Sequence, residues 1–362
     1  MKVFRLCLLA LLICFPIVSS IHARDTITIR DMAGRSVQVP ATPERIICLG
    51  PGTLRLIVYL GVQHKLVGIE GMEKNLPTGR PYWYANQALA RLPVIGPGGP
   101  AAINKDPDLE AVLTVKPQLI FLTQMEPARA EALQRKLSVP VVFLSYGKVG
   151  SFDSVVYDSL RLAGKIMGAD KRAEEVIAYT ERSRKDLAAR TGTVAGERPV
   201  VYAGGIGFKG THGIESTDAD YVPFKWTGAR NGAKALDGRE HVFADREKLL
   251  ALDPDVIFLD AAGLPLVLQD YGKRPEYYRA SKAFKTDRVY VLYPYNFYAT
   301  NIESVLADAY AVGKVLYPQG FSDIDLKKKA DEIFKFFVGG PVNDRMEKDF
   351  GVLGRRLELP KP

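Results

Sequence analysis

LEAVLTVKPQLIFLT, residues 109–123, has a close counterpart in EKLLALDPDVIFLD, residues 247–260. Each stretch begins as an amphipathic helix, stops at a proline, and continues as an apolar segment with the length of a buried strand. We interpret the two stretches as the same helix–strand unit, present once in each of two lobes. The alternative is a chance likeness between two ordinary helix–strand units.

Short apolar segments alternate with amphipathic ones on either side of both stretches. Alternating strands and helices are typical of βαβ units, whose strands form parallel sheets. Ahead of them, ITIRDMAGRSVQV reads as a two-stranded hairpin that turns at Ala33 and Gly34. The buried strands are expected at residues 45–50, 65–70, 118–124, 139–145, 199–205, 255–260 and 288–294.

Residues 151–190 have a wholly helical pattern that separates the two sets of strands. The part from Asp170 to about Arg190 is charged on most faces, which suits a helix that bridges two lobes. A helix of about 20 residues is about 30 Å long. We therefore predict an α/β protein whose two αβ lobes, 24–150 and 191–362, have mainly parallel sheets, are joined by one long helix, and enclose a ligand cleft.

Residues 1–23 have the features of a secretory signal. Lys2 and Arg5 precede an apolar run over residues 6–18, and small residues then lead to Ala23. The run is too short to remain as a membrane-spanning helix. A buried N-terminal helix is the alternative, but the pattern favours export to the periplasm.

The cysteines bear on both anchoring and stability. A lipid anchor requires a cysteine after a small residue, whereas Cys14 follows Ile13, so we expect a soluble periplasmic protein. Removal of the signal also removes Cys7 and leaves Cys48 without a partner for an internal disulfide. Such an exported chain depends on its apolar core, for which its length is sufficient.

The charge pattern excludes one class of partner and favours another. The formal net charge is +8, but Lys and Arg are interleaved with acids along the chain. Nucleic-acid binding requires a concentrated basic face, so we expect none. A mild positive field suits a small anionic ligand.

Several phrases, taken in order, resemble the periplasmic siderophore, haem and vitamin B12 binding proteins of ABC importers. They extend over residues 27–318 and are TPERIICLGPGTLRLIVYLGVQHKLVGIE, LPVIG, DLEAVLTVKPQLIFL, VPVVFL, LLALDPDVIFLD and RVYVLYPYNFYATNIESVLADAYAVGKVLYP. The resemblance implies a monomer without enzyme activity or intrinsic cofactor, which delivers an iron chelate to an ABC permease dimer at the inner membrane.

The resemblance also assigns a role to two acids. In that family one glutamate on each lobe contacts arginines of the permease, and Glu110 and Glu247 occupy the matching positions at the start of the paired helices. The alternative is that each acid only stabilises the N-terminus of its own helix.

Candidate ligand contacts lie in loops that follow the strands, because open αβ sheets bind ligands at the carboxyl ends of their strands. Aromatic rings in these loops suit planar chelates. Glycines in 203–224 allow the backbone to approach a ligand closely. Arg55 lies where the family often has a carboxylate, and its positive charge favours an anionic ligand. The alternatives are that the aromatic side chains fold back onto their own lobe and that 203–224 is an ordinary surface loop. The candidates are Arg55, Tyr82, Trp83, Tyr84, Lys209, His212, Arg230, Arg239, His241, Tyr295, Asn296 and Tyr298.

Two other functions remain open at this point. A direct binder of a bare metal ion or an oxyanion is one, but His64, His212 and His241 are scattered and make a poor metal cage. We therefore expect any metal to arrive already chelated. A hydrolase acting in the cleft is the other, although the sequence has no nucleophile elbow, phosphate-binding loop or His-Glu metalloprotease motif.

Overall fold

The computed structural model describes residues 25–75, 79–147, 152–192, 197–236 and 241–359. The predicted signal, residues 1–23, and the candidate Arg239 lie outside the described residues. Among the helices of the described part, none is both long and apolar enough to cross a membrane.

The N-terminal lobe is built on a parallel sheet of four strands in the order β4-β3-β5-β6. Each strand is short and almost entirely apolar, as expected where helices cover both faces, and Cys48 lies buried on β3 as a free thiol. The strands are β3 (Ile46–Leu49), β4 (Leu66–Gly68), β5 (Leu119–Leu122) and β6 (Val141–Phe143). The helices are α1 (Thr53–Tyr59), α2 (Gly71–Asn75), α3 (Pro81–Ala85), α4 (Leu109–Val115) and α5 (Pro127–Leu137).

The predicted hairpin is confirmed ahead of this sheet, where β1 (Thr26–Arg30) pairs antiparallel with β2 (Ser36–Pro40). Asp31 fixes its turn, because its carboxylate accepts hydrogen bonds from the backbone of Ala33 and Arg35. Three short 3₁₀ helices complete the lobe: η1 (Gln63–Lys65), η2 (Gln87–Arg91) and η3 (Pro100–Ala102).

The C-terminal lobe has its own parallel sheet, in the order β12-β11-β7-β9. A small antiparallel pair, β8 (Ser216–Asp218) with β10 (His241–Phe243), lies beside it. The sheet strands are β7 (Val200–Gly204), β9 (Arg230–Asn231), β11 (Val256–Asp260) and β12 (Val289–Leu292). The helices are α8 (Val222–Thr227), η4 (Gly232–Ala235), α9 (Arg246–Leu252), α10 (Leu264–Lys273), α11 (Pro275–Ala280) and α12 (Lys282–Lys285).

The two predicted helix–strand units have the same construction in both lobes. Asp108 caps α4 by accepting the backbone N–H of Ala111, and Asp245 caps α9 by accepting that of Lys248. Each helix ends in a left-handed residue before its proline and then leads into β5 or β11. The equivalence read from the sequence is therefore confirmed.

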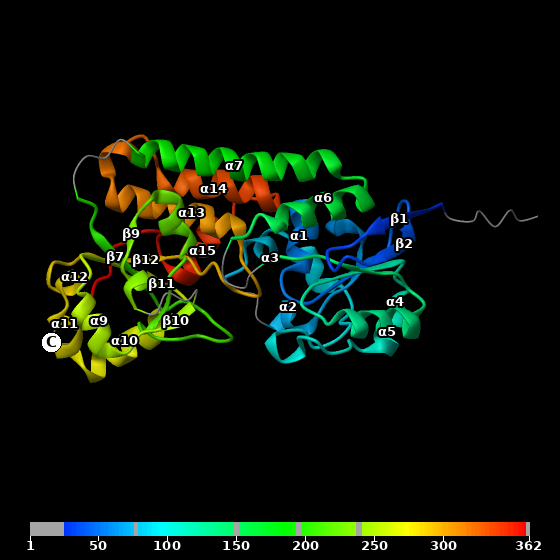
Figure 1. Cartoon of the computed structure of the whole chain (residues 1–362), viewed down its shortest axis with the longest axis horizontal. Helices are drawn as coiled ribbons and strands as arrows, with labels where there is room; N and C mark the ends of the chain where they lie inside the picture. The colour runs from blue at the N-terminus through cyan, green and yellow to red at the C-terminus, as the bar shows by residue number, and fades with distance from the viewer. Residues whose placement is uncertain (1–24, 76–78, 148–151, 193–196, 237–240, 360–362) are drawn as a thin grey trace, which may run out of the picture.

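Helices behind the cleft join the lobes (Figure 1). The predicted bridge is α7 (Asp170–Gly192), which follows α6 (Val155–Met167) after a left-handed turn at Gly168. One apolar cluster includes residues from both parallel sheets and from α7, α13 and α14, so the lobes share a packed layer. The C-terminal helices are α13 (Ile302–Leu316), η5 (Pro318–Phe321), α14 (Leu326–Val338) and α15 (Asn343–Phe350).

A second connection crosses the cleft itself. Arg55 on α1 is fully buried, and its guanidinium donates to the backbone carbonyls of Phe297, Tyr298 and Thr300 in the loop after β12, at 2.9, 3.1 and 3.0 Å. Tyr298 and Ala299 in that loop have left-handed backbone, with φ of 54° and 69°. Such strain persists only where surrounding contacts hold it. Arg55 supplies those contacts.

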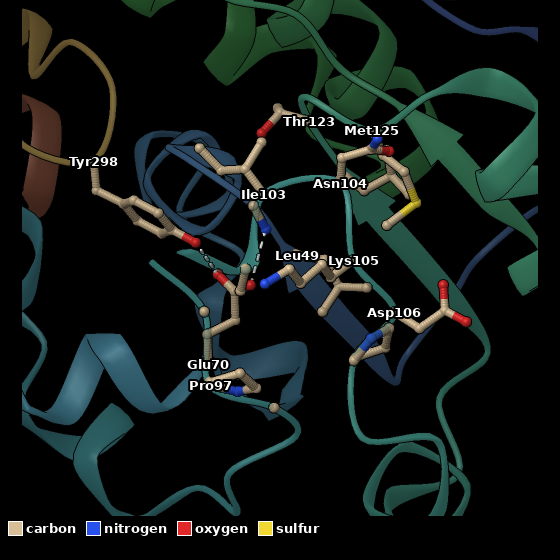
Figure 2. Close-up of a pocket in the computed structure, with 16 residues that line it drawn as sticks. Leu49, Glu70, Pro97, Ile103, Asn104, Lys105, Asp106, Thr123, Met125 and Tyr298 are labelled. Carbon is tan, nitrogen blue, oxygen red and sulfur yellow. Dashed lines mark hydrogen bonds between the residues drawn. The ribbon is translucent and has the colours of Figure 1, made fainter. Parts of the chain in front are cut away.

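The same loop also makes a side-chain bond to the N-terminal lobe. The hydroxyl of Tyr298 donates to the Glu70 carboxylate at 2.6 Å (Figure 2). The same hydroxyl accepts the N–H of Gly99 at 3.1 Å. We call this set of bonds, from Arg55 and Glu70 to residues 297–300, the interlobe clasp. Arg55 was expected to contact a ligand, but here it is fully buried, donates to these carbonyls and lies over the rings of Tyr82 and Tyr146.

We predict that Arg55→Met lowers the free energy of unfolding by about 2–4 kcal/mol, because buried carbonyls lose a charged donor. Arg55→Lys should recover part of the loss, since the ammonium reaches fewer carbonyls. The control is Arg230→Met, at an exposed arginine paired with Glu197, which should change stability by less than about 0.5 kcal/mol. Urea denaturation measures all three, and an Arg55→Met value equal to that of the control would contradict the clasp.

We also predict a pH dependence that originates at Glu70. Burial raises the pKa of this carboxyl to about 7, although hydrogen bonds from Tyr298 and Gly50 oppose the shift. The folded protein then keeps a proton that the unfolded chain releases near its ordinary pKa of 4.5, so stability falls as pH rises between about 4.5 and 7.

Glu70→Gln removes this titration and keeps a carbonyl oxygen that accepts the N–H of Gly50, while its amide N–H can donate to the Tyr298 hydroxyl. The variant should lose less stability than the native chain between pH 5 and 7, with a residual slope from other buried carboxyls such as Asp260, whose pKa burial also raises to about 7. Denaturant melts at several pH values measure the slope. An unchanged slope would show that Glu70 ionises freely.

Candidate ligand pocket between the lobes

A pocket of about 310 Å³ lies between the lobes at the carboxyl ends of the parallel strands. Its N-terminal wall comes from residues that follow β3, β4 and β5, and its C-terminal wall from residues that follow β7, β11 and β12. Parallel sheets place their strand ends together in this way. The lining residues are Pro51, Met72, Pro100, Ile103, Gln124, Gly207, Phe208, Lys209, Gly210, Thr211, Asp260, Ala262, Pro294, Asn296, Phe297, Tyr298 and Ala299.

The pocket is mostly apolar and carries few polar groups, a composition typical of small-molecule sites. Lys209 is the cationic side chain among these described lining residues, and it is exposed. Asp260 lies buried at the end of β11, where its carboxyl accepts the N–H of Ala262 at 2.9 Å. Asn296 donates to the carbonyl of Gly207 at 2.9 Å and thereby ties the two C-terminal loops together.

A much smaller cavity adjoins this pocket inside the N-terminal lobe (Figure 2). Glu70, Thr123 and the loop over residues 96–107 line it, and it shares Ile103 and Tyr298 with the larger pocket. Its volume of about 20 Å³ is enough for a single water. Of these two adjoining spaces, the interlobe pocket is the one large enough for a solute.

Three of the predicted ligand residues line this pocket: Lys209, Asn296 and Tyr298. His212 and His241 lie in a ring cluster beside it, in contact with Phe208 and Phe243.

The other predicted contacts lie elsewhere. Tyr295 is fully buried against Tyr221, with 5.5 Å between ring centroids. Arg230 is exposed on β9 and pairs with Glu197 at 3.0 Å. Neither is among the residues that line the pocket.

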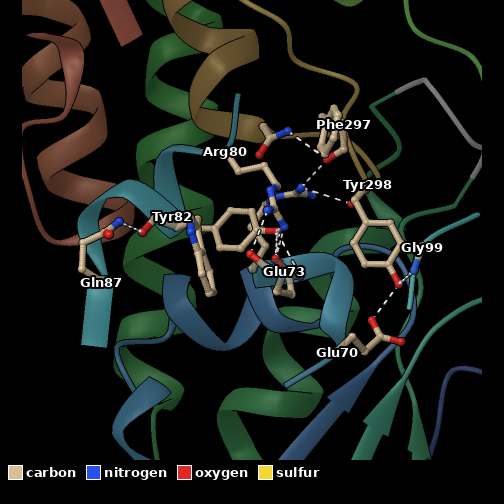
Figure 3. Close-up of polar contacts among 11 residues, drawn as sticks. Glu70, Glu73, Arg80, Tyr82, Gln87, Gly99, Phe297 and Tyr298 are labelled. Atoms are coloured by element: carbon tan, nitrogen blue, oxygen red, sulfur yellow. Dashed lines mark hydrogen bonds and ion pairs between the residues drawn. The ribbon is translucent and has the colours of Figure 1, made fainter. Parts of the chain in front are cut away.

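The aromatic run Tyr82, Trp83 and Tyr84 is also placed differently from the expectation, because it forms the short helix α3 and is buried. Buried Arg80 pairs with Glu73 and lies against the rings of Tyr82 and Trp83 (Figure 3). The Tyr82 hydroxyl donates to the same carboxylate at 3.0 Å. Tyr82, Trp83 and Tyr84 are therefore buried within the lobe and are not among the residues that line the pocket.

Among the lining side chains that sequence reasoning missed are Met72, Ile103, Phe208, Asp260 and Phe297. A signal was present for three of them, because Asp260, Phe208 and Phe297 lie in or just after the ends of predicted strands. Met72 lies on the short helix α2, whose first residues bond to the carbonyls of Gly96 and Pro97, and Ile103 follows GPGGP at 96–100; tertiary contacts place both.

Glu110 and Glu247 are exposed in the first turns of α4 and α9. These helices lie on the side of the two lobes away from α7 (Figure 1). The paired placement expected from the sequence is thus present on one side of the molecule.

Comparison with known proteins finds others that are similar in sequence and architecture. The molybdate-binding protein MolA of Haemophilus influenzae is 25% identical over 335 residues, covering 85% of this chain and 90% of that protein. Its structure with molybdate aligns with a TM-score of 0.69 at 22% identity, covering 87% of this chain and 98% of that one.

Other solved structures share the fold. A periplasmic solute binding protein from Veillonella parvula has a TM-score of 0.70 at 21% identity, covering 90% of this chain and 97% of that one. The haem binding protein HmuT has a TM-score of 0.55 at 20% identity, covering 84% and 94% of the two chains. Residues 46–295 match the sequence pattern of periplasmic binding proteins. The chain belongs to the periplasmic binding protein family.

Proposed function

We propose that this protein is exported and delivers a compact, anionic iron chelate to an ABC importer. The observation that carries the proposal is the interlobe pocket of about 310 Å³, whose walls are largely apolar and whose one described cationic side chain is Lys209. Apolar walls suit the organic shell of a chelate, and a cation beside them suits its net negative charge.

The donor groups favour a chelated metal over a bare ion. A bare transition-metal ion requires several His, Cys or carboxylate ligands that converge on it. Within the described residues, three or more such side chains are nowhere grouped to hold an ion. The organic ligand would therefore supply the coordination that the protein does not.

An oxyanion is the second candidate, favoured by the similarity to the molybdate-binding protein MolA over 85% of this chain. A bare oxyanion requires convergent hydrogen-bond donors, and the apolar lining offers few from side chains. Calorimetric titration of the purified protein with ferric citrate and with molybdate distinguishes the chelate from the oxyanion. Tight binding of molybdate without binding of any ferric complex would overturn the chelate proposal.

We predict that Lys209→Gln weakens binding of the preferred anion about tenfold, as expected for the loss of one charged contact. Lys234→Gln is the matched control, because Lys234 is exposed on η4 of the same lobe and does not line the interlobe pocket. Calorimetric titration measures both variants. Equal affinities for the two variants would remove Lys209 from the site.

The exposed pair Glu110 and Glu247 supports a docking role toward the importer's permease. Exposed ion pairs are worth only about 0.2–1 kcal/mol each, whereas partly desolvated interfacial pairs are worth more. We predict that Glu110→Arg combined with Glu247→Arg leaves ligand affinity unchanged and lowers uptake into cells.

The control for this double variant is Glu175→Arg with Glu332→Arg, which reverses the same number of charges on α7 and α14, on the other side of the molecule (Figure 1). It should leave uptake unchanged. Uptake of labelled ligand and affinity in solution are measured separately. Equal uptake by both double variants would rule out docking through Glu110 and Glu247.

A further inference from the structure

Four rings of the C-terminal lobe form a cluster beside the interlobe pocket: Phe208, His212, His241 and Phe243. Phe208 lines the pocket and stacks on His241, with centroids 4.2 Å apart and planes 11° apart. Phe243 meets Phe208 and His241 edge-on, at 6.5 and 5.0 Å. We call this cluster the aromatic lip.

Phe243 is unusual in its exposure. It is 51% exposed and is the one phenylalanine among the large apolar side chains that stay exposed in the described residues. Exposed apolar surface next to a ligand site commonly marks a contact that the ligand covers. Because the lip continues directly from the pocket through Phe208, a ligand seated in the pocket is the partner within reach.

The lip is held in one arrangement. The Nε2 atom of His212 bonds to the carbonyl of Phe208 at 2.8 Å, and that of His241 bonds to the hydroxyl of Ser216 at 3.2 Å. Pairing of β10 with β8 puts His241 and Phe243 on one face of their strand. A surface fixed in this way loses little entropy when a flat group stacks on it.

The His241 ring of the lip is uncharged at neutral pH. Burial, with a smaller contribution from neighbouring His212, lowers the pKa of the His241 ring to about 4. The ammonium of Lys209 lies 5.5 Å from the centroid of the Phe208 ring. On the opposite lobe Ile103 lines the same pocket and is 37% exposed. The edge of the interlobe pocket beside the aromatic lip thus combines flat rings, an aliphatic side chain and one ammonium.

From this geometry we propose that the aromatic lip is a second subsite, which stacks an aromatic ring of the chelator while Lys209 pairs with an anionic oxygen on that ring. The ligand class is therefore an aryl chelator that binds its metal through phenolate or carboxylate oxygens. This inference rests on the proposed function and narrows it, because an aliphatic chelate would leave the lip uncovered.

The test compares two ferric complexes, one with 2,3-dihydroxybenzoate and one with citrate. Both present iron through anionic oxygens, but only the first carries rings. The native protein should bind the dihydroxybenzoate complex more tightly. Phe243→Ala should weaken that complex about threefold to tenfold, the range expected for one aromatic contact, and leave citrate binding unchanged. Leu266→Ala, at an exposed apolar residue on α10 outside the pocket lining, is the control and should affect neither.

The outcomes separate the subsite from the function. If the native protein binds ferric citrate and Phe243→Ala changes neither affinity, the aromatic subsite is overturned and the chelate function stands. If Phe243→Ala weakens both complexes equally, Phe243 shapes the pocket and does not recognise a ring. If the native protein binds neither complex and takes molybdate alone, both proposals fail. Thermal unfolding of Phe243→Ala, expected to match the native protein, excludes misfolding as the cause of lost binding.

Discussion

The Arg55 guanidinium is the interaction on which the pocket depends. It belongs to one lobe and binds three carbonyls of the other. A buried charge is costly unless its hydrogen bonds are made, and here they are made by a loop whose left-handed residues would otherwise relax. Together with the bond from the Tyr298 hydroxyl to Glu70, these contacts hold residues 297–299 in place as a pocket wall.

The clasp works together with the packed layer behind the cleft. Helix α7 and the C-terminal helices connect the lobes on one side, while residues 297–300 connect them within the cleft. Two connections on different sides restrict rotation about either one. The lining of the pocket has apolar walls and the Lys209 cation, and the aromatic lip lies beside it.

The fold was largely predictable because it depends on local patterns. The apolar strands, the hairpin, the paired units capped by Asp108 and Asp245, and the charged bridging helix all have periods or end signals that a sequence displays. The site was much less predictable. Arg55 was assigned to a ligand, yet its partners lie more than 240 residues away and are backbone carbonyls, which no side-chain pattern reveals. Tyr82 and Trp83 were predicted to face the cleft. They are buried beside the pair of Arg80 with Glu73, and the sequence gives no sign of that pairing.

The burial of Cys48 has a practical consequence for labelling this protein with fluorophores. The thiol is buried on β3, and burial, reinforced by Glu70 and Glu73, raises its pKa well above the ordinary value. The thiolate is the form that attacks thiol reagents, so this buried, protonated cysteine should not react with them. A fluorophore attached to a cysteine introduced at the exposed Ile103, with a second on the opposite lobe, would then report the distance across the mouth without a background signal from Cys48.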